Sequence, residues 1–176
     1  MLLRREWRAM IPRAARVKTL TAVCALVACA AAAAAQLAGM PAPDFVLKSV
    51  AGRNVRLSEF RGEVVMLSFG ATWCGDCRAQ LAQLNEMQTR YHDAGIELLA
   101  VSLDQNAKQA GEMATAGAGF PVLHDVGGEV GRLYEVGKVP VVVLIDRAGV
   151  VRKVFEGYRR GAEAQYLESV QALLRE

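Results

Sequence analysis

Two cysteines, Cys74 and Cys77, are the residues whose type and spacing could carry out chemistry. Two residues separate them, and the two other cysteines, Cys24 and Cys29, belong to an N-terminal segment of different composition. A disulfide between such near neighbours closes almost no loop, so it would contribute little to the stability of the fold. The spacing instead predicts a dithiol that is reversibly oxidised to a disulfide, a reaction that suits an oxidising compartment.

A zinc site is another use that proteins make of paired cysteines, and a structural zinc ion takes four protein ligands. The chain has only two histidines, His92 and His124, and neither stands at a zinc-finger spacing. The sequence therefore predicts no metal site and no cofactor. We assign no chemical role to His124 or to Asp104, which we expect at the ends of strands.

The segments on either side of the cysteines should hold them at the start of a helix. Residues 64–69 form an apolar run, typical of a strand buried on both faces, that leads directly into Trp73 and Cys74. Apolar residues then recur in steps of three and four from Cys77 to Tyr91, which predicts an amphipathic helix ended by Gly95. Cys74 should therefore lie at the helix N-terminus and Cys77 one turn inside, on the buried stripe.

This placement predicts different roles for the two sulfurs. Disulfide exchange needs a thiolate, whereas a free cysteine with a pKa of about 8.5 is mostly protonated at neutral pH. The positive end of the helix dipole would stabilise the thiolate of Cys74, which we expect to be the nucleophile, with Cys77 as the shielded resolving thiol. The position of Trp73 favours a place at the surface beside the nucleophile, with a place in the core as the alternative. A structural pair of buried cysteines remains the alternative.

The rest of the chain alternates between strand and helix patterns. Strands are predicted at residues 45–48 and 54–57, as a hairpin, and at 96–103, 120–123, 141–145 and 150–155. Further helices are predicted at 107–116, 129–134 and 162–174, the last one burying Ala164, Leu167, Val170 and Leu174. This order predicts an α/β fold with a mixed sheet in a single domain.

Composition and charge exclude several classes of protein. Hydrophobic residues make up 53% of the chain and charged residues 22%, which excludes a disordered or collagen-like protein. Residues 1–29 hold six basic residues and one acidic residue, a net charge of +5, so the remaining 15 basic and 17 acidic residues give −2. Because the basic excess lies outside the expected domain, we predict no nucleic-acid partner.

Residues 1–38 have the pattern of an export signal, with a basic stretch to Lys18, an apolar run and then small residues. Cleavage after residues 33–35, Ala-Ala-Ala, would release a soluble protein. Residues 26–29, Leu-Val-Ala-Cys, instead resemble a lipobox, in which Cys29 would be acylated, and residues 19–38 are just long enough for an uncleaved membrane anchor. Each interpretation places the domain, residues 39–176, outside the cytoplasmic membrane, in the periplasm or an equivalent space, and the last two attach it to the membrane.

Four segments stand in an order that is similar to the TlpA/ResA-like branch of the thioredoxin-fold family. They are Pro43–Phe45, Leu57–Gly62, Phe69–Arg78 and Val139–Gly149. The resemblance covers the chain from about Gly39 onward. It implies a thioredoxin fold with a mixed central sheet flanked by helices and an N-terminal β-hairpin extension. It also implies a thiol–disulfide oxidoreductase that acts on proteins outside the cytoplasm. We expect it to act as a reductant, for example in cytochrome c maturation, with electrons from an upstream membrane donor, and oxidation of its partners is the alternative.

The resemblance also implies a substrate groove. The Val139–Pro140 bond should be cis and pack against the disulfide, which would leave the backbone of Val139 to pair with an extended substrate segment. Two residues depart from the family pattern, namely Asp76, where proline usually precedes the second cysteine, and Gln80, where a carboxylate is frequent. We expect the charge of Asp76 to raise the thiol pKa. In the family pattern that carboxylate is a candidate acceptor for the proton of the buried thiol. Gln80 has no carboxylate, so the role is left open, and Asp76 is a candidate for it.

Two other functions compete with disulfide exchange. A peroxiredoxin-like thiol peroxidase shares the fold and the Pro-Asp-Phe entry, but its usual Pro-x-x-x-Thr-x-x-Cys motif would require proline and threonine where Leu67 and Ala71 stand. A non-enzymatic adaptor would use the groove alone and would not need the pair of cysteines. Protein thiols and disulfides are therefore the expected partners.

Overall fold

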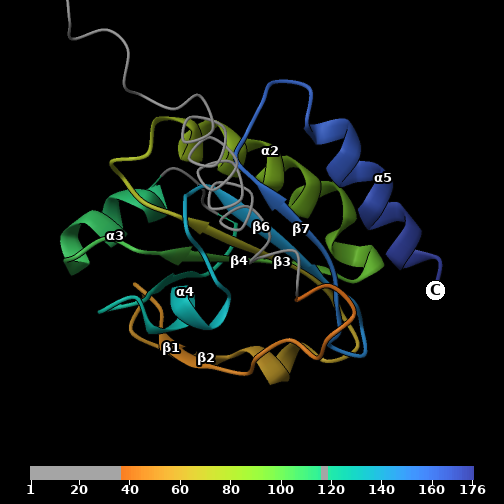
Figure 1. The fold of residues 1–176 in the computed structure, drawn as a ribbon, viewed down its shortest axis with the longest axis horizontal. Coiled ribbons are helices and arrows are strands. Elements are labelled where there is room, and N and C mark those ends of the chain that lie inside the picture. Colours follow the sequence, from red (N-terminus) through yellow and green to blue (C-terminus); the bar gives the residue numbers. More distant parts are fainter. Residues whose placement is uncertain (1–36, 116–118) are drawn as a thin grey trace, which may run out of the picture. The chain divides into compact units, whose positions relative to one another are not determined.

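The strands and helices follow the alternation of apolar patterns along the chain (Figure 1). This computed structural model describes residues 37–115 and 119–176. The strands are β1 (Val46–Lys48), β2 (Asn54–Arg56), β3 (Val64–Gly70), β4 (Ile96–Ser102), β5 (Val122–His124), β6 (Val141–Ile145) and β7 (Val151–Glu156). The α-helices are α2 (Gly75–Tyr91), α3 (Ala107–Thr115), α4 (Glu129–Leu133) and α5 (Glu163–Leu174). Short 3-10 helices occur at Leu57–Phe60 and His92–Ala94.

Five of the strands form one mixed sheet in the order β5-β4-β3-β6-β7. β4 is parallel to both β3 and β5, whereas β6 is antiparallel to both β3 and β7. Every residue of β3 and of β6 is buried, which explains why these segments are apolar without alternation. β1 and β2 form a separate antiparallel pair, the predicted N-terminal hairpin.

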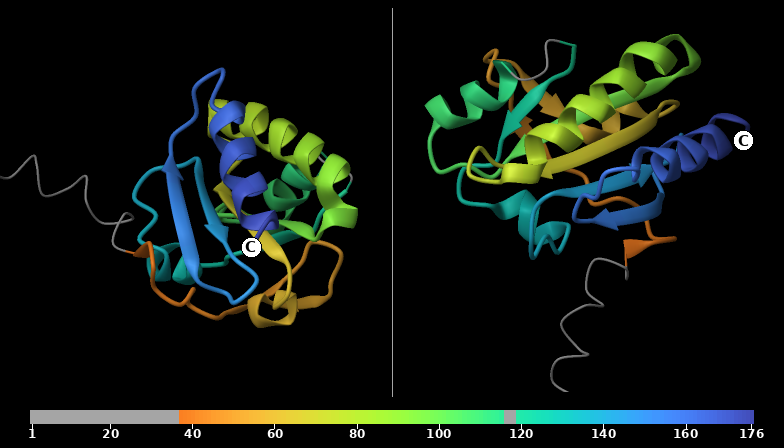
Figure 2. Two further views of the ribbon diagram at one scale, coloured as in Figure 1. Left: turned by 90° about the vertical axis from the view of Figure 1, so that its right-hand side faces the viewer. Right: turned by 90° about the horizontal axis from the view of Figure 1, so that it is seen from above.

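The connections between strands determine which face of the sheet each helix covers. The successive crossovers β3-α2-β4 and β4-α3-β5 run in the same direction along the sheet, so right-handed connections place α2 and α3 on one face. The chain then returns through α4, which lies on the other face with the β1-β2 pair. Figure 2 shows α5 beside α2, and the two helices share an apolar cluster with alternate residues of the strands. The thioredoxin fold predicted from the resemblance is therefore present.

The buried face of α5 differs from the prediction. Tyr166, Val170 and Leu173 are buried, whereas Ala164 is exposed and Leu167 and Leu174 are half-buried. The reason is Tyr166, whose ring packs edge to face against Phe155 with 4.7 Å between centroids. The stripe through Tyr166 therefore faces the sheet, and Leu167 and Leu174 pack at the edge of the same apolar cluster.

The predicted leader lies largely outside the described residues, including Cys24 and Cys29. Contacts divide the chain into Met1–Ala33 and Ala34–Glu176. Near the start of the described residues, the N–H of Gly39 donates to the carbonyl of Val151 at 2.7 Å, which ties this part of the chain to the sheet. Across residues 37–115 and 119–176, no helix has both the length and the apolar character needed to cross a membrane.

Candidate active site

Cys74 and Cys77 form a disulfide at the N-terminus of α2, with their Cα atoms 5.4 Å apart. Cys74 is the N-cap residue, with extended backbone angles, and Gly75 is the first residue of the helix. The first N–H groups of a helix have no partners within it, so the positive end of the helix dipole faces the sulfur of Cys74. The local sequence produces this geometry because the buried strand β3 ends only a few residues before the helix begins.

The two sulfurs differ in exposure. Cys77 is only 6% exposed and belongs to the apolar core, whereas Cys74 is half-buried. A partner molecule can therefore approach Cys74, while Cys77 is shielded by the strand beneath it. This is the arrangement expected from the helical pattern.

Gly70, the last residue of β3, makes room for the buried cysteine. A Cβ atom at this position would lie 3.3 Å from the Sγ of Cys77 and 3.3 Å from the Cε of Met113. Such contacts are tighter than ordinary van der Waals packing, so a larger residue would displace Cys77 or Met113. Gly70 was not among the site residues predicted from the sequence, although a glycine that ends a buried strand beside a cysteine pair is a signal of close packing.

Trp73 lies beside the disulfide and is 69% exposed. A large aromatic residue in this position offers a contact surface rather than a part of the core. The preceding residue, Thr72, fixes the loop, because its N–H and its hydroxyl donate to the carboxylate of Asp104 over 3.0 and 2.8 Å. The position of Cys74 therefore depends on Asp104, which follows the end of β4.

Asp104 is 1% exposed and was given no role from the sequence. Its carboxylate also accepts a hydrogen bond from the hydroxyl of Ser102 at 2.9 Å. The ring Nε2 of His124 lies 2.9 Å from the backbone carbonyl of Asp104. The carboxyl ends of parallel strands meet at the same edge of a sheet, which is the signal that could have linked Asp104 to the cysteines.

The Val139–Pro140 peptide bond is cis, as the resemblance implies. Both residues are buried, and the carbonyl of Pro140 accepts a hydrogen bond from the N–H of Gly157 at 2.8 Å. Val139 lines a hollow of about 470 Å³ together with Trp73 and Cys74. The structure thus brings Trp73 and Val139, two of the three predicted groove residues, to one opening beside the half-buried Cys74. Pro140, the third, lines a neighbouring hollow.

The two residues that depart from the family pattern lie in different surroundings. Asp76 is exposed in the first turn of α2 and lines the same hollow. Gln80 is 1% exposed, and its Nε2 donates to the hydroxyl of Tyr166 at 2.9 Å and to the carbonyl of Gly157 at 3.5 Å. Gln80 therefore holds α5 and the chain after β7 against α2.

Tyr166 remains a neutral hydroxyl in this arrangement. Burial raises the pKa of Tyr166 above its usual value, and the hydrogen bond from Gln80 offsets part of that effect. The hydroxyl can therefore accept the amide hydrogen of Gln80 throughout the physiological pH range.

A smaller hollow, of about 240 Å³, opens on the other side of the disulfide and is lined by both cysteines, Arg78, Glu112 and Met113. The disulfide is thus reachable from two sides. Among the residues that the structure describes, no group of three or more histidine, cysteine, aspartate or glutamate side chains could hold a metal ion.

Comparison with known proteins identifies relatives over most of the domain. Residues 38–154 match the model of the AhpC/TSA family. The thiol-disulfide oxidoreductase ResA of Geobacillus thermodenitrificans is 37% identical over 134 residues, which are 75% of this chain and 77% of that protein. The ResA of Oceanobacillus iheyensis is 36% identical over 124 residues, covering 68% of this chain and 65% of its own length.

Solved structures give the same result. A protein of Chlorobium tepidum assigned as thiol:disulfide interchange protein DsbE has a TM-score of 0.74 and 36% identity, over 78% of this chain and 97% of its own. The exposed lipoprotein thioredoxin of Streptococcus pneumoniae has a TM-score of 0.65 and 28% identity, over 74% of this chain and 100% of its own.

Proposed function

Because this chain belongs to the AhpC/TSA family, as a ResA/TlpA-like thiol–disulfide oxidoreductase of thioredoxin fold, we propose that Cys74 and Cys77 carry its activity toward partner proteins outside the cytoplasm. The observation that supports this assignment is the disulfide at the start of α2, with one sulfur half-buried and the other buried. An exposed nucleophile and a shielded second thiol are what a two-step exchange requires.

In the reduced protein the thiolate of Cys74 attacks one sulfur of the partner's disulfide. A bond forms between Cys74 and the partner, and the partner's other sulfur leaves as a thiolate that takes up a proton. Cys77 then loses its proton and attacks the sulfur of Cys74, which releases the partner's second thiol and forms the Cys74–Cys77 disulfide. Two electrons pass to the partner, and an upstream membrane donor returns the protein to the dithiol.

The hollow between Trp73 and Val139 would receive the partner. Both residues line it together with Cys74. We assign the backbone of Val139 to pair with an extended segment of the partner, as strands add to exposed edges in other complexes. Asp76, at the rim, is positioned to influence the charge near the sulfurs.

The physiological direction that we favour is reduction, for example of the cysteines of a cytochrome c before haem attachment. The basic and apolar leader in residues 1–38 supports a location outside the cytoplasmic membrane. The proposal allows three fates of residues 1–38. The protein is attached to the membrane through an acylated Cys29, it is released by cleavage of the signal, or it keeps the segment as an uncleaved membrane anchor. Cys29→Ser should release the protein from the membrane fraction if the acyl chain holds it, and unchanged fractionation would exclude that fate.

Trapping of the mixed disulfide tests the function. In Cys77→Ser the second step cannot occur, so partners should accumulate on Cys74, where mass spectrometry identifies them. Cys74→Ser is the matched control and should trap none of them. Turnover with hydrogen peroxide but with no protein disulfide would indicate a thiol peroxidase instead, and full function in the double serine variant would indicate an adaptor.

A further inference from the structure

The active site continues into a groove that is longer than the opening beside the disulfide. The 470 Å³ hollow at Cys74 and a second hollow of about 680 Å³ are both lined by Asp76, Lys138 and Val139. Because they share these residues, the two hollows form one groove. It runs from Trp73 past Pro140 to the loop between β7 and α5, residues 157–162.

The floor of the second hollow is aromatic and fixed in place. Phe155, Tyr158 and Tyr166 line it, and the first and last of these rings pack edge to face. Tyr166 is bound by Gln80 of α2, and Gly157 donates to the carbonyl of Pro140. The floor is therefore connected both to the helix that carries the cysteines and to the cis-proline.

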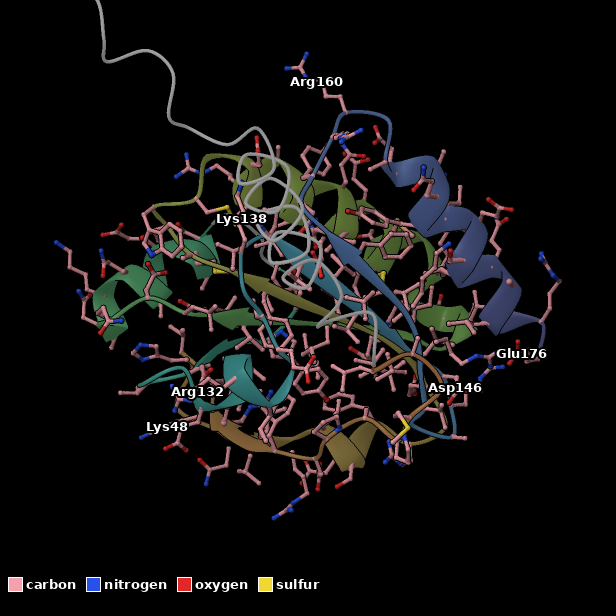
Figure 3. All side chains as sticks on the ribbon, viewed as in Figure 1. Lys48, Arg132, Lys138, Asp146, Arg160 and Glu176 are labelled. Carbon is pink, nitrogen blue, oxygen red and sulfur yellow. A yellow bond between two sulfur atoms is a disulfide. The ribbon has the colours of Figure 1, made fainter. Side chains whose placement is uncertain are left out.

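The rim of the second hollow is rich in positive charge. Lys138, Arg159 and Arg160 line it and are exposed, against two carboxylates, Asp76 and Glu156. Figure 3 shows Arg160 projecting from the loop, on the same side of the domain as Lys138. The chain after residue 29 has 15 basic and 17 acidic residues, so this excess of cations is local.

These cations are available to a partner. Arg56 and Arg152 form ion pairs with carboxylates of this chain. Within residues 37–115 and 119–176, no ion pair involves Lys138, Arg159 or Arg160. An acidic segment could thus bind to these three residues without breaking an ion pair among the described residues.

We propose that this groove selects partner proteins with acidic side chains close in sequence to the exchanged cysteine, and that Lys138, Arg159 and Arg160 determine the preference. The inference rests on the proposed function, since the segment that enters the groove is the one whose cysteine reaches Cys74. A segment extended along Val139 rises about 3.3 Å per residue, so side chains several residues from the cysteine reach the cationic rim. The aromatic floor accommodates apolar side chains between them.

Three peptide disulfides of one sequence, with glutamate, glutamine or lysine flanking the cysteine, test the proposal. The reduced full-length protein should reduce the glutamate peptide about tenfold faster than the glutamine peptide at low ionic strength, because several modest exposed ion pairs act together. The lysine peptide should be the slowest of the three. Added salt should shrink the difference, since the charges are exposed.

Variants of the protein then show which residues cause the preference for the glutamate peptide. In the triple variant Lys138→Gln, Arg159→Gln, Arg160→Gln, the ratio of glutamate to glutamine rates should fall to about one. The matched control Lys48→Gln, Arg53→Gln, Arg175→Gln removes the same charge from exposed positions that line neither hollow, and it should keep the ratio. Glu156→Gln should increase the ratio. If the triple variant does not fold, Arg160→Gln alone should give a smaller decrease.

Equal rates for the glutamate and glutamine peptides, faster reduction of the lysine peptide, or an unchanged ratio in the triple variant would overturn the proposal. Reduction of no peptide at all would count against the proposed function instead. In that case the affinity of the oxidised protein for labelled, cysteine-free peptides, measured by fluorescence anisotropy, tests whether the groove prefers acidic segments. This binding requires no disulfide exchange. Tighter binding of the glutamate peptide would support the proposal, and equal binding would reject it.

Discussion

Gln80 Nε2 donates a hydrogen bond to the hydroxyl of Tyr166 at 2.9 Å, and this buried contact joins the helix that carries the cysteines to α5. The residue lies one turn beyond Cys77, at the position where the resemblance led us to expect a carboxylate. In this chain the position serves to bind α5 and the end of β7, through Tyr166 and Gly157. The neutral amide therefore has a structural role here.

Gln80→Leu should destabilise the protein by about 1–3 kcal/mol, because the hydroxyl of Tyr166 would lose its buried donor. Denaturant unfolding of the oxidised protein measures this loss. Tyr166→Phe removes the other partner and is the matched variant. The double variant should lose less than the sum of the two single losses, since both remove the same contact. Strictly additive losses would show that the two side chains are not coupled.

The Gln80–Tyr166 contact also shows what the sequence could not predict. The helical pattern correctly indicated the bounds of α5 to within one residue, but not which side chains it buries. Tyr166 lies on that face, where it packs against Phe155 and accepts a hydrogen bond from Gln80, 86 residues away. Local patterns contain no information about such a partner, since it becomes a neighbour only when the sheet is assembled.

The position of the disulfide was predictable because it depends on local patterns alone. A continuous apolar run predicts a buried strand, and steps of three and four predict a helix, so the residues between them must lie at the helix N-terminus. Asp104 was missed for the opposite reason. It meets Thr72, 32 residues away, because β3 and β4 are parallel neighbours whose ends coincide.

Asp104→Ala should lower the rate of disulfide exchange about tenfold and destabilise the fold by about 1–3 kcal/mol, because Thr72 loses its acceptor and the loop before Cys74 loosens. The rate of Cys74 alkylation in the folded protein measures the local effect. Asp104→Asn keeps one oxygen acceptor and should restore part of both losses. If Asp104→Ala alters stability but neither alkylation nor exchange, the residue does not position the site.

Gly70→Ala should cost about 1–3 kcal/mol of stability, because the new Cβ would press on Cys77 and Met113 at 3.3 Å. Gly75→Ala is the matched control, since nothing lies within 4 Å of a Cβ at that position. It should be neutral or slightly stabilising, as alanine favours a helix more than glycine does. Thermal unfolding of both variants compares the two glycines, and equal losses would contradict the packing argument.

The two sulfurs should react at different rates after reduction. Cys74 is half-buried at the helix N-terminus and Cys77 is 6% exposed, so alkylation near neutral pH should modify Cys74 at least about tenfold faster. Mass spectrometry of the singly modified protein identifies the site. Equal rates would reject the assignment of Cys74 as nucleophile and Cys77 as resolving thiol.

Asp76 should hold back thiolate formation at Cys74, because a carboxylate in the first turn of α2 opposes a second negative charge nearby. Asp76→Asn should then move the half-maximal alkylation of Cys74 to lower pH and make the disulfide easier to reduce, since a stabilised thiolate favours the reduced form. The shift should shrink in high salt, because Asp76 is exposed. Asp93→Asn makes the same charge change beyond the other end of α2 and should leave the alkylation profile unaltered. A profile that is the same in Asp76→Asn as in the unsubstituted protein at low salt would remove the electrostatic role of Asp76 and leave the helix terminus as the source of thiolate stabilisation.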